Sequence, residues 1–336
     1  MELQKLIFDE IRARIPIEST WSRELAKTLH LGRDAIYRRE RGEVQLTLKE
    51  VELLCKKFGI SLDKYLLADQ YAVVFKHTSL NRDDLYNYKQ YLDQLLKHLH
   101  MIHSCQRKEI IFCADDIPIF HFMDFPELTY FKLYTWNQAV LNLGTPFEAF
   151  VYELKKQNLE PTFKKLHEIY QAIPSREIWT KSTISPFLEL LAYYQSINSF
   201  QSEQSIITLN RQLKQLVENL KAWTMGQEKQ SGVGFDLYVS PVNLGLSQMV
   251  CQFDEKQSVS VKLYTINSIA TMDKNYVEET IDWIRGILNK SSCLSRLSEK
   301  ERIFFFKDME QSVAGIAEKI SSNLCLFVIS SYSMMI

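Results

Sequence analysis

The chain is poor in the residues that interrupt regular structure. Of its 336 residues only 10 are glycine and 8 are proline, whereas 46% are hydrophobic and 12% are aromatic. With 24% charged residues, this composition excludes collagen-like and intrinsically disordered classes. We therefore expect long helices and large cores, arranged in two or three domains for a chain of this length.

An excess of charge of one sign is also missing, because the formal net charge is −1. Residues 1–67 hold 13 Lys and Arg against 11 Asp and Glu, and the remainder holds 27 against 30. A chain with so little net charge does not bind nucleic acid through its overall field. Any such affinity has to come from a local surface.

Paired cysteines and long apolar runs are absent as well. The six cysteines are dispersed without any Cys-x-x-Cys spacing, which argues against a disulfide framework or a zinc ribbon and favours a reducing compartment. No run of about 18 apolar residues predicts a membrane span. The first 15 residues carry acidic as well as basic side chains, unlike a signal peptide. These absences predict a cytoplasmic protein without membrane contacts.

The sequence lacks the motifs of common enzyme classes, including the serine-hydrolase elbow, the phosphate-binding loop, the HExxH zinc motif and the dinucleotide fingerprint. Asp115 and Asp116 follow an apolar run, where aspartates cap the next element more often than they bind metal or transfer protons. We therefore predict no enzyme activity and no cofactor. The aromatic-rich stretch 112–152 leaves open a pocket for a small apolar molecule or a peptide.

One cluster of metal-ligating residue types does occur between residues 98 and 121. Its spacing matches no zinc motif, and neither cysteine has strong basic activation for redox chemistry, although Arg107 and Lys108 lie nearby. Ordinary surface and core positions account for these residues better than a metal site or a redox pair. The residues are His98, His100, His103, Cys105, Cys113 and His121.

Apolar spacing predicts a bundle of short helices in the first 68 residues. Ser19 or Thr20 is expected to cap the second helix and Thr47 the fourth. Gly42 is expected to end the third helix in a left-handed conformation. The predicted helices cover residues 3–15, 21–29, 33–41, 48–58 and 61–67.

Three stretches of this bundle carry the most informative pattern. They read RELAKTLHL, GRDAIYRRERGE and LTLKEVELLCKKFGISLDKYL, and their order and spacing resemble the Cro/CI-type (XRE-family) helix-turn-helix domain of bacterial and phage regulators. In the helix at 33–41, Ala35 and Ile36 face inward and the polar side chains share the other face. The resemblance covers about 50 residues and implies a lambda-repressor-like helical bundle that binds duplex DNA.

The resemblance also implies which residues meet DNA, because in this family the N-terminal part of the third helix enters the major groove. Arg33 and Tyr37 are assigned to base edges, Arg38 to a base or a phosphate, and Arg41 to a phosphate. A phosphate is expected at the start of the second helix. The complete predicted DNA-binding set is Ser22, Arg23, Gly32, Arg33, Asp34, Tyr37, Arg38 and Arg41.

Other positions of the motif have structural roles by the same resemblance. Glu40 is expected to form an ion pair with an arginine of the first helix, either Arg12 or Arg14. His30 stands where the family usually has a glycine in the turn, so a strained or altered turn is expected there.

Beyond residue 68 the domain plan is a linker with an amphipathic helix (69–105), a mainly helical middle region (106–225) and an α/β C-terminal region (226–336). Strands are predicted at 109–114, 235–240, 246–253 and 258–266, with a linker at 226–234. The helix at 82–104 has an a/d pattern that fits either packing on its own domain or dimerisation. The predicted fold is mainly α with a smaller α/β part that contains a short antiparallel sheet.

These features predict a sequence-specific, DNA-binding transcriptional regulator that acts as a homodimer, because one such domain covers only half of a palindromic site. The C-terminal region is expected to dimerise and to sense a small-molecule or peptide effector. One alternative is a protein-interaction module or scaffold with a degenerate helix-turn-helix domain. Another is an enzyme in residues 105–336 with a DNA-binding appendage.

Overall fold

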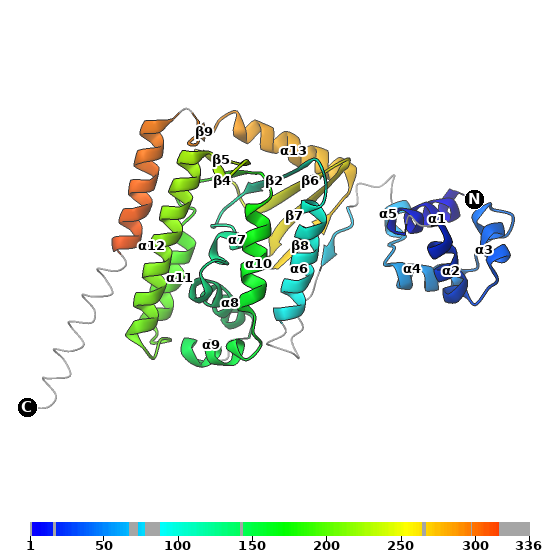
Figure 1. Cartoon of the computed structure of the whole chain (residues 1–336), viewed down its shortest axis with the longest axis horizontal. Coiled ribbons are helices and arrows are strands. Elements are labelled where there is room, and N and C mark those ends of the chain that lie inside the picture. The colour runs from blue at the N-terminus through cyan, green and yellow to red at the C-terminus, as the bar shows by residue number, and fades with distance from the viewer. Residues whose placement is uncertain are drawn as a thin grey trace, which may run out of the picture. The chain divides into compact units, whose positions relative to one another are not determined.

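A computed structural model of the chain describes residues 2–15, 18–66, 73–77, 88–141, 144–263, 267–296 and 298–315. The chain divides into two compact units, Met1–Val74 and Phe75–Ile336 (Figure 1). Within the described ranges, no helix is both long enough and apolar enough to cross a membrane.

The N-terminal unit is a bundle of short helices, as the apolar spacing predicts. Its helices are α1 (Glu2–Arg14), α2 (Glu18–Leu29), α3 (Arg33–Glu40), α4 (Leu48–Phe58) and α5 (Asp63–Leu66). Their apolar faces meet in one core, and burying it stabilises each short helix more than helix propensity can. The buried core side chains are Ile7, Phe8, Ile11, Trp21, Leu25, Leu29, Ile36, Leu54 and Ile60.

Local capping signals are confirmed at α4 but not at α2. The Thr47 hydroxyl accepts from the backbone N–H of Glu50 at 3.3 Å, and the Glu50 carboxylate accepts from the backbone N–H of Thr47 at 2.8 Å. This reciprocal pair is a capping box. The predicted cap at Ser19 or Thr20 is wrong, because α2 begins at Glu18 and already contains both residues.

The C-terminal unit is built on one mixed sheet, whose described strands run in the order β1-β8-β7-β6-β2-β3-β5-β4, with β9 also paired to β5. β2 and β5 are parallel to β3, and the other pairs are antiparallel. The strands are β1 (Lys76–His77), β2 (Lys108–Cys113), β3 (Ser175–Trp179), β4 (Glu228–Gln230), β5 (Val233–Val239), β6 (Gln248–Phe253), β7 (Lys256–Leu263), β8 (Asn267–Thr271) and β9 (Ser292–Cys293).

Helices cover both faces of this sheet. One face carries α13 (Lys274–Leu288), and the other carries a thick helical layer (Figure 1). A further helix at residues 299–315 packs into that layer through Phe305, Phe306 and Met309. The remaining helices of the layer are α6 (Tyr88–His103), α7 (Ile119–Phe122), α8 (Pro126–Leu141), α9 (Phe147–Lys155), α10 (Glu160–Gln171), α11 (Ser185–Ser196) and α12 (Glu203–Gly226).

Strand β2 is apolar at four successive residues, 110–113. Ile110 and Phe112 face the helical layer, whereas Ile111 and Cys113 face α13. Successive side chains of a strand point to opposite faces, so the part of a strand that is covered on both sides has apolar residues in succession. The predicted strand at 109–114 is therefore confirmed as a central, doubly covered strand.

The sheet changes the predicted division of residues 69–336. Strands β2 and β3 come from the predicted middle region, and β6 and β5, which pair with them, come from the predicted C-terminal region. The predicted boundary at 225/226 therefore falls inside one unit. The linker expected at 226–234 is instead a hairpin of β4 and β5, and the short antiparallel sheet is part of a larger mixed one.

The helix predicted at 82–104 was expected either to pack on its own domain or to dimerise. Its residues 82–87 lie outside the described ranges, and the rest correspond to α6. Tyr88, Leu92, Leu99 and Ile102 of α6 are buried in the core of the C-terminal unit. The apolar stripe therefore packs on its own unit. Whether this helix also contributes to dimerisation stays a prediction.

Candidate nucleic-acid interface

The candidate recognition helix α3 is held by one buried side chain and a defined start. Ile36 is 0% exposed and lies in the core of the N-terminal unit. Gly32 is the N-cap, with extended backbone, and its carbonyl accepts from the N–H groups of Ala35 (3.1 Å) and Ile36 (3.2 Å). This anchoring fixes which face of α3 meets solvent.

The turn between α2 and α3 keeps a left-handed residue although it lacks the usual glycine. His30 has φ of 54°, and the N–H of Leu31 donates to the carbonyl of Ala26 at 3.0 Å. The strained turn expected at this position is confirmed, because a left-handed residue with a Cβ costs roughly 1–2 kcal/mol.

The outward face of α3 carries the predicted polar side chains. Arg33, Asp34 and Arg38 are exposed, and Arg38 keeps 59% of its side chain accessible. Arg33 and Asp34 occupy the first turn of the helix, the part that reaches base edges in helix-turn-helix proteins. The exposure of these three side chains is compatible with their approach to a major groove.

An acidic residue that sequence reasoning overlooked lies among the arginines. The carboxylate of Glu43 is 2.6 Å from Nε of Arg41 and 3.4 Å from Nε of Arg38. The hydrogen bond from Arg41 lowers the pKa of Glu43, so the carboxylate stays ionised. Arg41 itself is the C-cap of α3 rather than part of the helix. Glu43 thus offsets part of the positive charge on this face.

Tyr37 and Glu40 both contact the rest of the N-terminal unit. The ring of Tyr37 meets Trp21 edge-on at 5.8 Å between centroids, which keeps Tyr37 half-buried. Glu40 forms an ion pair with Arg12, whose guanidinium also lies 4.9 Å from the Trp21 ring centroid. Of the two arginines expected to pair with Glu40, Arg12 is the partner, while Arg14 bonds to Glu10 and to the Phe58 carbonyl.

The two α2 residues that were predicted to bind phosphate differ in their exposure to solvent. Arg23 is exposed. Ser22 is only 1% exposed, and its hydroxyl is buried without a hydrogen-bond partner. Because α2 begins four residues earlier, at Glu18, Ser22 lies in its second turn, on the inward side. The predicted contact between Ser22 and a phosphate is incompatible with this position.

Gln4 of α1 holds the loop that follows α3. Its side-chain amide donates to the carbonyls of Arg39 (2.5 Å) and Val44 (2.9 Å), and its oxygen accepts from the N–H of Leu46 (2.8 Å). The side chain is 8% exposed. The only sequence signal for these three hydrogen bonds was a polar residue, Gln4, on the inner face of an amphipathic helix.

In the C-terminal unit, the candidate metal and redox residues are dispersed. Among the described residues, no group of three or more His, Cys, Asp or Glu side chains is placed to hold a metal ion. Burial raises the pKa of the Cys113 thiol to about 12, which disfavours the reactive thiolate. His121 is occupied in a buried pair with Glu177 at 2.9 Å.

Glu177 on β3 is the centre of a buried polar cluster that the sequence did not reveal. Its carboxylate is 0% exposed and accepts from the Tyr170 hydroxyl at 2.6 Å and the Trp179 indole at 2.9 Å, in addition to His121. Lys229 lies in the same region, and burial lowers its pKa to about 7. Three side chains thus donate to one buried carboxylate, which ties β3 to α7 and α10 inside the core.

Comparison with known proteins agrees with this geometry. Residues 12–65 match the family model described as helix-turn-helix, and no family model matches the C-terminal unit. No match was found among curated proteins. The N-terminal unit therefore contains a DNA-binding helix-turn-helix domain of the XRE type, the class found in transcriptional regulators.

Proposed function

We propose that the chain is a sequence-specific transcriptional regulator that binds its operator as a homodimer and has no enzymatic activity of its own. The observation that carries the proposal is the outward face of α3, where Arg33, Asp34 and Arg38 are exposed while Ile36 is buried. A single helix of this kind reads one half-site, so specific affinity calls for two copies on a palindrome.

In this proposal the C-terminal unit holds two copies together and responds to an effector. Binding of that effector would change the relative population of conformations that fit the operator. Exposed apolar side chains on two consecutive helices are available for contacts between copies, such as Tyr193 of α11, its C-cap Ile197, and Ile207 of α12.

The test is selection of bound genomic DNA fragments with the full-length protein. A two-fold symmetric consensus is expected, with its half-sites one helical turn or a multiple apart. The variants Arg33→Ala and Arg38→Ala should each weaken binding to that consensus by about 1–3 kcal/mol. Lys57→Ala is the matched control, because Lys57 is an exposed cation on α4, which lies across α2 from α3 (Figure 1).

A second function, a protein-interaction module, is favoured by one observation. Glu43 contacts both Arg38 and Arg41, so part of the arginine face is already neutralised. In that case no DNA sequence would be enriched, and the arginine variants would instead reduce capture of a protein partner. Enrichment without any dependence on Arg33 or Arg38 would contradict the assignment of α3 as the reader.

A further inference from the structure

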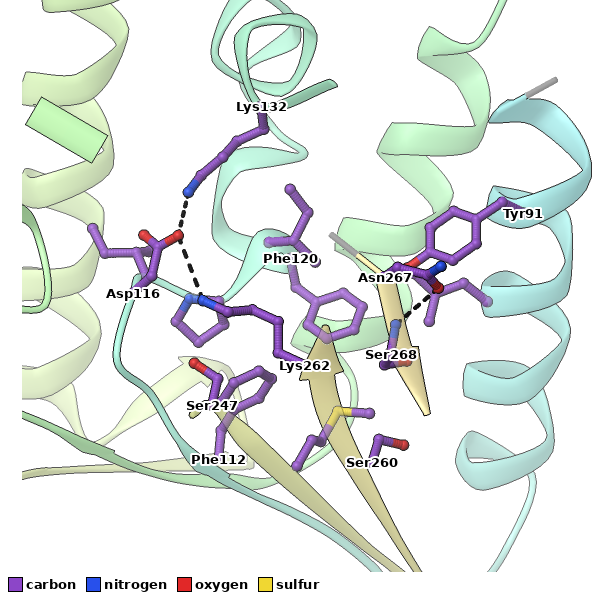
Figure 2. Close-up of a pocket in the computed structure, with 15 residues that line it drawn as sticks. Tyr91, Phe112, Asp116, Phe120, Lys132, Ser247, Ser260, Lys262, Asn267 and Ser268 are labelled. Carbon is purple, nitrogen blue, oxygen red and sulfur yellow. Dashed lines mark hydrogen bonds and ion pairs between the residues drawn. The ribbon is translucent and has the colours of Figure 1, made fainter. Parts of the chain in front are cut away.

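A cavity lies in the C-terminal unit between the sheet and its helical layer. Its volume is about 80 Å³, and the described residues that line it belong mainly to α6, α7, β2, β6, β7 and β8. Figure 2 shows Asp116, Lys132 and Lys262 on one side of it, and Asn267 and Ser268 on the other. The rest of the wall is largely apolar and includes Leu95, Phe112, Ile117, Ile119, Phe120 and Met249.

The charged groups at this cavity are already compensated by one another. Lys132, whose side chain is 2% exposed, bonds to Oδ2 of Asp116. The Lys262 ammonium lies 2.7 Å from Oδ1 of Asp115, and that oxygen also accepts from the Ser247 hydroxyl. Two cations thus pair with two carboxylates. A charged ligand would bring an uncompensated charge into apolar surroundings or would have to break one of these pairs, and both are costly.

Two neutral polar groups at the cavity are free for a ligand. The hydroxyls of Ser260 on β7 and Ser268 on β8 line it, and neither hydroxyl makes a hydrogen bond with another described residue. Ser260 and Lys262 share one face of β7, and Ser268 is the residue opposite Lys262, so the three side chains lie on the same side of the sheet. A serine hydroxyl both donates and accepts, so it can bond to an uncharged hydroxyl or carbonyl group.

We propose that this cavity binds a small uncharged molecule whose short alkyl end fills the apolar part and whose hydroxyl or carbonyl group meets Ser260 or Ser268. A concave site of mostly apolar side chains with a few polar groups is the usual form of a small-molecule site. The paired ions exclude charged ligands, and the free hydroxyls orient the ligand. Binding itself is independent of DNA, whereas the role of this ligand as the effector of the regulator rests on the proposed function.

The volume of the cavity limits the part of the ligand that it encloses. A water molecule occupies about 30 Å³ in the liquid, so 80 Å³ holds two or three groups of that size. A methyl or methylene group is of similar size, whereas a cavity that holds a benzene ring measures about 150 Å³. An alkyl end of about three carbons therefore fits, and a ring is too large to be enclosed. Each methylene moved from water to an apolar site strengthens binding about fourfold, which corresponds to about 0.8 kcal/mol.

The binding test is titration of the full-length protein, without DNA, with the straight-chain alcohols from ethanol to 1-hexanol. Isoleucine δ1 methyl signals in the NMR spectrum report the place of binding. Signals of Ile117 and Ile119, which line the cavity, should shift saturably, whereas those of Ile281 and Ile284, buried under α13 on the other face of the sheet, should not. Affinity should rise about fourfold per carbon up to about three or four carbons and then level off. No saturable shift of Ile117 and Ile119, or a rise that continues unchanged to 1-hexanol, overturns the inference.

Charged analogues test the role of the paired ions. 1-Butylammonium and butanoate have nearly the length of 1-butanol but carry one charge, so each should bind at least tenfold more weakly. Binding of either ion within tenfold of 1-butanol overturns the selection of an uncharged ligand. Because no DNA is present, failure of these titrations leaves the DNA-binding proposal intact. If 1-butanol binds here without changing operator affinity, the binding site stands and its role as the effector site is refuted.

Two variants place the site. Ser260→Leu on β7 and Leu95→Phe on α6 each narrow the cavity, one from the sheet and one from the helical layer, without removing a charged group. Each should weaken binding of 1-butanol at least tenfold. Gln257→Leu is the matched control, because it adds an apolar side chain at an exposed position of β7, and it should leave the affinity unchanged. Unchanged affinity in both narrowing variants overturns this location, and unshifted Ile281 and Ile284 signals show that each variant has kept its fold.

Discussion

Replacing Gln4 tests whether one side chain controls the loop behind the recognition helix. Its three hydrogen bonds to residues 39, 44 and 46 are each worth about 1 kcal/mol net, and the backbone groups left behind lose their partners. We therefore expect Gln4→Ala to lower the free energy of unfolding of the N-terminal unit by about 2–4 kcal/mol. Gln4→Glu should be equally damaging, because a carboxylate cannot donate to the two carbonyls.

The two units are separate compact bodies, so a single global unfolding transition is not a safe measure of one of them. Hydrogen exchange by mass spectrometry on the full-length protein resolves the N-terminal helices individually. A loss of about 2–4 kcal/mol predicts exchange roughly 30- to 1,000-fold faster in the most protected amides of α1 to α4. Peptides of the C-terminal unit should not change.

Gln45→Ala is the matched control, because Gln45 lies in the same loop but is exposed. Its exchange should match that of the unmodified protein. If Gln4→Ala shifted stability by less than about 0.5 kcal/mol, which is the range of ordinary surface substitutions, the reasoning from these three hydrogen bonds would be refuted.

Three further predictions concern charge, backbone and pH. Glu43→Gln frees Arg38 and Arg41 from their carboxylate, so DNA should bind more tightly and with a steeper salt dependence in fluorescence anisotropy; weaker binding would contradict the exposed role of these arginines. His30→Gly relieves a left-handed residue and should stabilise the N-terminal unit by about 0.5–1 kcal/mol in the same exchange assay, unless the turn is unstrained. Lys229 has its pKa lowered to about 7 from 10.5, so the unfolded chain binds more protons between these values and stability should rise with pH from 7 to 9. The slope should be at most about 1.4 kcal/mol per pH unit, and Lys229→Met should lack this contribution when the stability of the C-terminal unit is followed by hydrogen exchange; equal slopes would show that burial does not shift the pKa of Lys229.

The secure predictions from sequence share one physical basis, which is that their signals are local. Helical spacing of apolar residues, the Thr47–Glu50 capping box and the left-handed Gly42 each depend on neighbours within about one turn. The ion pair of Glu40 followed from the family resemblance, and the structure chose Arg12 over Arg14. The buried strand at β2 was evident because its residues 110–113 are apolar in succession and lie against both covered faces.

The failures share the opposite basis, because they depend on where distant segments meet. Ser22 looked like a helix-opening residue, but α2 starts at Glu18 and turns Ser22 inward. The linker expected at 226–234 became a hairpin because β5 completes a sheet begun by β2 and β3. Glycine and polar residues between two apolar segments are compatible with a linker or a turn, and only pairing with a partner strand distinguishes them.

The sequence by itself determined the helix-turn-helix bundle and the polar face of its third helix, since both arise from periodicity and caps along a short stretch of chain. Only the tertiary structure decided that Glu43 offsets Arg38 and Arg41, that strands taken from residues 76–293 form one sheet, and that Asp116, Lys132 and Lys262 line one cavity. Asp116 and Lys262 are 146 positions apart, and no local pattern specifies such a meeting. The proximity of these two residues results from strand pairing and helix packing, which depend on segments far apart in the sequence.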